Sequence, residues 1–167
     1  MMSKKQKTIQ KEVSLTGVGL HTGNNVKMTF KPAPENHGFA FKRVDLEGCP
    51  TIEARAEFVV NTQRGTNLEK NGVLIQTSEH VLAAAVGLDI DNLIIEINAS
   101  EPPIMDGSSK FFVKALEKAG ITISKKIGRQ VFHDINGPYV VDRLELILLA
   151  LSPMRQLCIP FTENYKD

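Results

Sequence analysis

Apolar residues recur at helical spacing in two stretches of the chain. In the first stretch, an apolar stripe predicts a helix over residues 78–88 whose inner face packs on a core. Thr77 and Ser78 stand before this helix as capping residues, and Gly87 is a stop signal. The stripe consists of Val81, Leu82, Ala85 and Val86.

The second stretch predicts a helix over residues 109–119, with Gly120 as its stop signal. Its apolar stripe consists of Phe112, Ala115, Leu116 and Ala119. The preceding loop, residues 101–109, contains Pro102-Pro103 and Asp106-Gly107, so we expect a rigid connection that leads into this helix.

Before and between the helices the pattern changes to alternation and short apolar runs, which are typical of β-strands. Asn71-Gly72 is a strong hairpin signal. The predicted strands cover residues 8–15, 26–30, 39–41, 73–75 and 93–97, with two short extended pieces within 50–60. The pattern therefore predicts an α+β fold, a mostly antiparallel sheet with two helices packed on one face.

The pattern starts again after a polar stretch at residues 124–128. Residues 139–151 and 154–161 have the pattern of two strands joined around Ser152-Pro153, and two strands alone are only marginally stable. We therefore expect a first domain at residues 1–123, a linker at 124–128, and the truncated start of a second domain at 129–167.

Composition fits a soluble globular protein, because 42% of the 167 residues are hydrophobic and 23% are charged. The net charge of +1 gives no electrostatic reason to expect nucleic acid or an anionic membrane as a partner. We expect no membrane span and no signal peptide, because no apolar run has the length that either needs. Cys49 and Cys158 form no CxxC motif, which fits a reducing compartment, so we expect a cytoplasmic protein.

An acid and an imidazole, Glu79 and His80, are adjacent at the start of the first predicted helix. Neighbouring side chains on a helix point about 100° apart, so one can bind a metal while the other faces a water on that metal. Zinc lowers the pKa of such a water to about 7, and a carboxylate can take its proton. The same pair also fits a structural role, since Glu in a first helical turn suits the helix dipole. By spacing alone the structural role is the commoner one.

Four sequence blocks carry a resemblance to a known family, in their order and spacing. They are Leu-Thr-Gly-Val-Gly-Leu-His-Thr-Gly at 15–23, Arg-Gly-Thr at 64–66, Thr-Ser-Glu-His-Val-Leu-Ala-Ala at 77–84, and Ile-Met-Asp-Gly-Ser-Ser at 104–109. With Gly-Leu-Asp-Ile-Asp-Asn at 87–92, they resemble the UDP-3-O-acyl-N-acetylglucosamine deacetylases, zinc enzymes of lipid A synthesis in Gram-negative bacteria. The resemblance covers about residues 7–120, the first domain of the family.

The loop at 64–66 looks most like the Bacteroidetes members of this family, some of which are fused to a hydroxyacyl-dehydratase domain. No such domain is present in this sequence. The resemblance implies two domains of similar fold whose helices lie between their sheets. It also implies a Zn²⁺ cofactor and UDP-3-O-acyl-N-acetylglucosamine as the substrate.

The resemblance assigns roles to individual residues. Glu79 corresponds to the general base and His80 to a zinc ligand. His21 and Thr22 correspond to residues near the mouth of the site, although a turn-stabilising hydrogen bond is an equal alternative for His21. Gly65 and Thr66 lie in a loop that borders the site, and we take all four as substrate-binding candidates. For Asp106, support of the loop structure is favoured over a direct substrate role.

The other two zinc ligands of the family are a His and an Asp four residues later in the second domain, where a further His acts as general acid. The histidines of this chain are His21, His37, His80 and His133, and neither His37 nor His133 has an Asp four residues on. A catalytic zinc site needs three protein ligands, and this chain supplies one.

We therefore expect the chain to be the amino-terminal part of the deacetylase, completed by the missing second domain. The alternative is a stand-alone, non-catalytic binding or interaction domain of the same fold. Because the chain is expected to be a fragment, we expect it to be a poor enzyme on its own. We also expect it to self-associate through residues 139–161 and through the helix face that the missing domain would cover.

Overall fold

A computed structural model describes residues 5–62 and 65–127 of the chain, and this part contains ten strands and two α-helices. In chain order the elements are β1 (Lys5–Ile9), β2 (Val13–Val18), β3 (Asn25–Pro32), β4 (Phe39–Arg43), β5 (Thr51–Glu53), the short 3-10 helix η1 (Ala56–Phe58), β6 (Val59–Asn61), β7 (Asn67–Lys70), β8 (Val73–Ile75), α1 (Glu79–Gly87), β9 (Leu93–Ile97), α2 (Lys110–Ala119) and β10 (Ile121–Ile127).

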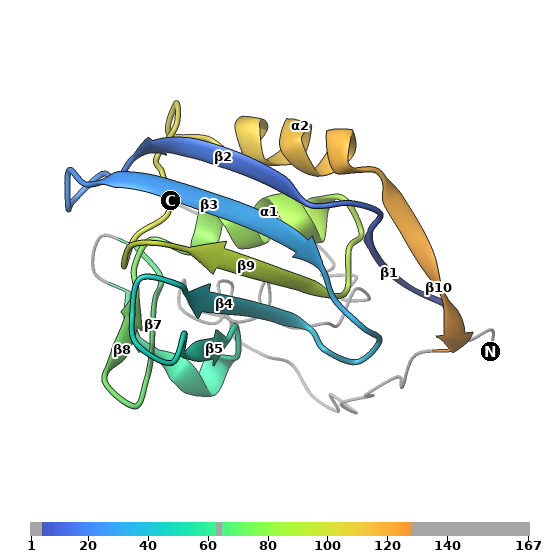
Figure 1. Cartoon of the computed structure of the whole chain (residues 1–167), viewed down its shortest axis with the longest axis horizontal. Coiled ribbons are helices and arrows are strands. Elements are labelled where there is room, and N and C mark those ends of the chain that lie inside the picture. Colours follow the sequence, from blue (N-terminus) through green and yellow to red (C-terminus); the bar gives the residue numbers. More distant parts are fainter. Residues whose placement is uncertain (1–4, 63–64, 128–167) are drawn as a thin grey trace, which may run out of the picture.

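The centre of the fold is a five-stranded sheet of order β2-β3-β9-β4-β5, with both helices on one of its faces (Figure 1). Adjacent strands in this sheet are antiparallel, except that β4 and β9 run parallel. A three-stranded sheet, β6-β7-β8, and a two-stranded ribbon, β1-β10, complete the described part. The predicted α+β fold, with a mostly antiparallel sheet, is confirmed.

Alternation along β3 explains why the sheet has one apolar face. Val26, Met28 and Phe30 are buried, whereas the residues between them point to the other side. The rings of Phe30 and Phe112, on α2, meet edge to face with their centroids 6.5 Å apart, so the sheet and the helix share one core.

Both helices lie within one residue of their predicted bounds. On α2 the four residues of the predicted stripe are all buried. On α1 the buried residues are Val81, Leu82, Ala84 and Ala85, whereas Val86 is only partly buried. The stop signals differ: Gly120 follows α2 as expected, but Gly87 is the last residue of α1 and Leu88 closes the helix.

The predicted capping of α1 is wrong. Ser78 already has helical backbone angles, with φ −78° and ψ −16°, and its side chain caps no helix N–H. An N-cap that bonds the helix usually has an extended backbone. The Ser78 hydroxyl donates to the Thr66 carbonyl instead, and the Thr77 hydroxyl donates to Glu101.

Strand bounds differ at the two ends of the described chain. Residues 8–15, predicted as one strand, are split between β1 and β2, because β1 pairs with β10 whereas β2 pairs with β3. Residues 124–127, expected in a linker, extend β10 to Ile127. The predicted hairpin at Asn71-Gly72 is confirmed: it joins β7 to β8, and both residues have positive φ, 53° and 77°.

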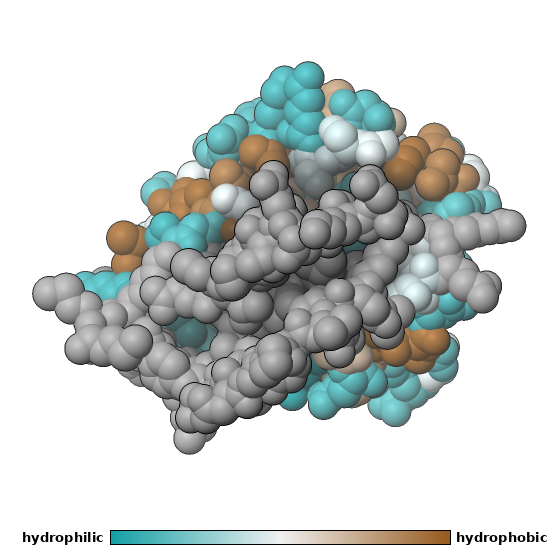
Figure 2. Space-filling view, turned by 180° about the vertical axis from the view of Figure 1, so that it is seen from behind, coloured by the Kyte–Doolittle hydropathy of each residue, from teal (hydrophilic) through white to brown (hydrophobic). Residues whose placement is uncertain are grey.

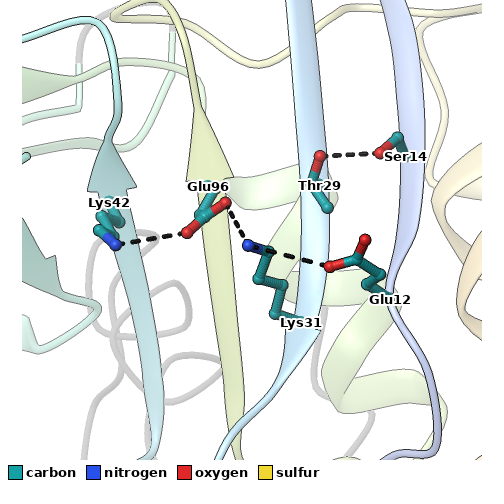
Figure 3. Close-up of polar contacts among 6 residues, drawn as sticks. All are labelled: Glu12, Ser14, Thr29, Lys31, Lys42 and Glu96. Atoms are coloured by element: carbon teal, nitrogen blue, oxygen red, sulfur yellow. Dashed lines mark hydrogen bonds and ion pairs between the residues drawn. The ribbon is translucent and has the colours of Figure 1, made fainter.

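The outer face of the five-stranded sheet is polar (Figure 3). Glu96 on β9 forms ion pairs with Lys31 at 2.8 Å and with Lys42 at 3.4 Å, and Ser14 and Thr29 share a hydrogen bond of 2.8 Å. The hydrogen bond from Lys31 holds the pKa of the Glu96 carboxyl below its usual value. The side chains of these ion pairs remain partly exposed, so water weakens the pairs and their contribution to stability is modest.

Apolar side chains on the side seen in Figure 2 form separate groups among hydrophilic ones. Val18 and Leu20 are about half exposed at the β2–β3 hairpin, as are Val60 on β6 and Ile123 on β10. No helix in the described residues is both long enough and apolar enough to cross a membrane.

The two strands predicted at 139–151 and 154–161 lie outside the described residues. The division into domains at 123 and 129 and the self-association of the fragment therefore stay predictions.

Shortening Phe112 tests the shared core. Phe112→Ala should destabilise the chain by about 3–5 kcal/mol, because a large aromatic ring is removed from a buried site. Phe111→Ala is the matched control. The Phe111 side chain is 38% exposed, so its loss should cost less than about 1 kcal/mol. Urea unfolding followed by circular dichroism measures both, and equal losses would contradict the packing described.

Candidate functional site

The Glu79 carboxylate is fixed where the first turn of α1 meets the start of β7. Its Oε2 accepts the backbone N–H of Thr66 at 2.8 Å. On the other side of this contact, the Ser78 N–H and hydroxyl both donate to the Thr66 carbonyl, at 3.1 Å and 2.9 Å. Ser78 and Glu79, at the start of α1, therefore both hydrogen-bond to Thr66, which restricts where the Glu79 carboxylate can point.

Gly65 permits this close approach. It has φ +155°, and a Cβ built on it would lie 3.2 Å from Thr77 Cα and 3.4 Å from Glu79 Oε1. A side chain at position 65 would be strained by the positive φ, would press on Thr77 and would lie in contact with the Glu79 carboxylate. The structure thus brings Gly65 and Thr66, both named from the sequence, into contact with Glu79.

His80 follows Glu79 and is partly exposed. Its ring lines a small recess together with Pro102, Pro103, Ile104 and Phe112. No hydrogen bond joins the His80 ring to another residue of 5–62 or 65–127. A neutral imidazole nitrogen is a common metal ligand.

A buried carboxylate that the sequence analysis did not single out lies behind this site. Glu101 follows β9 and is fully buried. Its Oε2 accepts the N–H groups of His21 and Thr22, each at 3.0 Å, and the Thr22 hydroxyl at 3.1 Å. Its Oε1 accepts the Thr77 hydroxyl at 3.0 Å.

Two opposing effects act on the pKa of the Glu101 carboxyl. Burial raises it, because the charged form loses its hydration, but the hydrogen bonds from Thr22, His21 and Thr77 favour the charged form. The hydrogen bonds dominate and hold the pKa below its ordinary value. Glu101 is therefore an anion inside the fold, and the groups that donate to it are fixed around it.

His21 and Thr22 therefore both have a structural role: their backbone N–H groups bind Glu101, whether or not their side chains also contact a ligand. Both occupy the turn between β2 and β3, and both are held to Glu101 through their backbone N–H groups. Through that carboxylate the turn is joined to Thr77, two residues before Glu79. The turn-stabilising hydrogen bond considered for His21 is present at its backbone.

Asp106 lies on the exposed part of the loop before α2. Its carboxylate accepts the hydroxyl of Ser108 at 2.7 Å and the Ser108 N–H at 3.1 Å, and the hydroxyl bond in particular lowers the pKa of this carboxyl. These bonds close a local turn, which agrees with the loop-supporting role favoured for Asp106.

Glu101 has a weak sequence signal. It is a charged residue that stands directly before the apolar stretch Pro-Pro-Ile-Met at 102–105. Its partners come from residues 24 to 80 positions away in the chain, so no local pattern reveals that it is buried and bonded.

The fold and this site define a class: an α+β domain that presents a fixed carboxylate next to an imidazole, two groups of the kind that hydrolytic centres use. The chain belongs to the UDP-3-O-acyl N-acetylglycosamine deacetylase family, whose sequence model matches residues 6–167. The resemblance drawn from the four sequence blocks is confirmed.

Named relatives agree with this family. The chain is 52% identical over 116 residues to "Bifunctional enzyme LpxC/FabZ" of Bacteroides thetaiotaomicron, and 53% identical over 116 residues to the enzyme of that name from Chlorobaculum tepidum; each match covers 70% of this chain and 25% of the relative. It is 48% identical over 124 residues to UDP-3-O-acyl-N-acetylglucosamine deacetylase of Xanthomonas campestris, covering 74% of this chain and 41% of the relative. The chain therefore spans from a quarter to two fifths of the length of these relatives.

Replacing Glu101 tests the buried anion. Because its folded pKa lies below the unfolded value of about 4.3, its stabilisation is fully present above pH 4.3 and is lost as the pH falls through the folded pKa. Glu101→Gln should therefore cost about 1.5–3 kcal/mol at pH 7, and the difference from the wild type should shrink below about pH 4.

Urea unfolding at pH 7 and at steps down to pH 3 measures this difference. Glu117→Gln on the exposed side of α2 is the matched control and should change little at any pH. A cost for Glu101→Gln that stays constant with pH would contradict a stabilising carboxylate.

Proposed function

We propose that the intact protein hydrolyses the N-acetyl group of UDP-3-O-acyl-N-acetylglucosamine in lipid A synthesis, in the cytoplasm and with zinc. Family membership supports the reaction class. The observation that carries the proposal is the hydrogen bond from the Thr66 N–H to Glu79, which fixes the carboxylate beside His80. A domain used only for binding does not require a carboxylate held in this way.

Glu79 acts as the general base. One of its oxygens, Oε2, is held by Thr66, and no other hydrogen bond to this carboxylate comes from a described residue. The second oxygen can therefore take a proton from the attacking water, while the Thr66 N–H keeps the carboxylate in one orientation. General-base catalysis by a positioned carboxylate contributes roughly 10²- to 10⁴-fold in rate.

His80 contributes a zinc ligand. Imidazole nitrogen is among the donors that zinc prefers, and the His80 ring makes no competing hydrogen bond to the described residues. A bound Zn²⁺ would supply Lewis-acid polarisation of the amide carbonyl. Residues 5–62 and 65–127 hold no cluster of three His, Cys, Asp or Glu side chains, and we propose that the remaining ligands come from a second domain, as the family resemblance implies.

Four further residues are proposed to bind the substrate. Gly65 and Thr66 form the loop in contact with Glu79, so a substrate bound at the carboxylate would lie beside this loop. His21 and Thr22 lie in the β2–β3 turn, which Glu101 joins to the start of α1. The substrate itself is proposed from the family, and its acyl chain is left unassigned.

Removing the base tests the reaction. In the intact protein, Glu79→Gln keeps the shape of the side chain but removes its basicity, so kcat for deacetylation of UDP-3-O-acyl-N-acetylglucosamine should fall about 10²-fold or more. Glu117→Gln, an equal change on the exposed side of α2, should leave kcat unchanged. Wild-type turnover in the Glu79 variant would rule out this role.

Removing the imidazole tests the metal. Loss of a group that hydrogen-bonds a metal ligand typically weakens metal binding 10- to 100-fold. His80→Ala in the intact protein removes the proposed ligand itself, so zinc binding should weaken by at least that much. His37→Ala is the matched control, because the hydrogen bond of the His37 ring goes to the carbonyl of the neighbouring Gly38 and not to the start of α1. Metal content after competition with a chelator measures both variants, and equal zinc retention would count against His80 as a ligand.

A further inference from the structure

The residue that leads into α1 has an unusual backbone. Thr77 has φ +51°, in the left-handed region that a β-branched residue rarely occupies. It lies two positions before Glu79, so its backbone angles set the direction in which the chain begins the helix. A residue is kept in such a conformation only where its surroundings determine it.

Two hydrogen bonds hold Thr77, and the one from its hydroxyl is buried. Its N–H donates to Asn67 Oδ1 at 3.2 Å, and its hydroxyl donates to Glu101 Oε1 at 3.0 Å. Thr77 is 6% exposed and Glu101 is fully buried, so water does not compete for the hydroxyl bond. A hydrogen bond to a buried carboxylate is among the stronger ones in proteins.

Glu101 is itself held rigidly. The segment after it is fixed to the end of β2, because the Ile104 N–H donates to the Val18 carbonyl and Gly19 forms a bridge with Pro103. A Cβ at Gly19 would lie 2.7 Å from Glu101 Oε2, so the glycine leaves room for the carboxylate. The Glu101 oxygens therefore have a defined position relative to the sheet.

We propose that Glu101 is a positioning residue, which through the Thr77 hydroxyl sets the direction of Glu79 and His80. It touches neither of them. It fixes the left-handed residue before α1, and the hydrogen bonds to Thr66 then complete the placement of Glu79. The effect on catalysis rests on the proposed function, whereas the effect on geometry does not.

The hydroxyl of Thr77 can be removed and restored with little change in volume. Thr77→Val removes the bond to Glu101 and keeps the branched shape, whereas Thr77→Ser keeps the hydroxyl. Thr29→Val makes the same change on the outer face of the sheet, where the hydroxyl bonds Ser14, and serves as the matched control. Glu101→Gln tests the other partner, and the Thr77 pair decides if that variant does not fold.

The first measurement is kinetic and uses the intact protein at a temperature where each variant is folded. Thr77→Val should lower kcat about 10-fold or more while KM changes less than about 3-fold, because a small misplacement of reacting groups mainly affects the transition state. Thr77→Ser should recover most of kcat, and Thr29→Val should keep it. Combining Thr77→Val with Glu101→Gln should cost little more than either alone.

The second measurement does not depend on activity or zinc. Hydrogen exchange by NMR on this chain reports the Thr66 amide, which Glu79 protects. Its exchange should become about 10-fold faster or more in Thr77→Val and return in Thr77→Ser, while the Ile95 amide in the sheet stays unchanged.

Each outcome separates the two proposals. The positioning role would be overturned if the Thr66 amide exchanged at the wild-type rate in Thr77→Val. It would also be overturned if Thr77→Val and Thr77→Ser lowered kcat and accelerated this exchange equally. If the wild type does not deacetylate UDP-3-O-acyl-N-acetylglucosamine but the exchange pattern holds, the proposed substrate is wrong and Glu101 is still the positioning residue.

Discussion

The apolar face of the five-stranded sheet leaves water only when both helices lie across it, and the remaining structure depends on that burial. Phe30 from β3, Ile95 from β9 and Phe112 from α2 are each at most 1% exposed. At about 25 cal/mol for each Å² of apolar surface removed from water, burial of such side chains is the main stabilising contribution. The helices are consequently fixed in position along their whole length, and the first turn of α1 is fixed with them.

Polar contacts then decide how α1 begins. Glu101 is a buried anion whose hydration is replaced by hydrogen bonds from the β2–β3 turn and from Thr77. Burying a charge is unfavourable unless it is bonded in this way. The requirement to satisfy one carboxylate thus joins three segments that are far apart in the chain. Glu79 and His80, the proposed catalytic pair, follow one of these segments at Thr77, so we infer that the way this carboxylate is satisfied also bears on the direction in which the pair points.

The two sides of the sheet have different chemistry for the same reason. Residues that alternate with the buried ones must face the other side, where Lys31, Lys42 and Glu96 form a solvated network (Figure 3). The charged groups on that face are only partly buried, so water still reaches their ion pairs. The site lies at the start of α1, on the side of the sheet that the helices cover.

Local patterns in the sequence by themselves determined both helices, the buried stripe of α2 and the β7–β8 hairpin, since periodicity and turn chemistry need only neighbouring residues. The family was indicated separately, by the resemblance of the four sequence blocks. They also marked Glu79 and His80. Only the tertiary structure decided that β1 leaves the main sheet for β10, that Ser78 bonds Thr66 instead of capping α1, and that Thr77 is left-handed. It also revealed Glu101, whose partners lie up to 80 positions away. The burial of a carboxylate and the bonds that satisfy it depend on segments that meet only after folding, and no local pattern contains them.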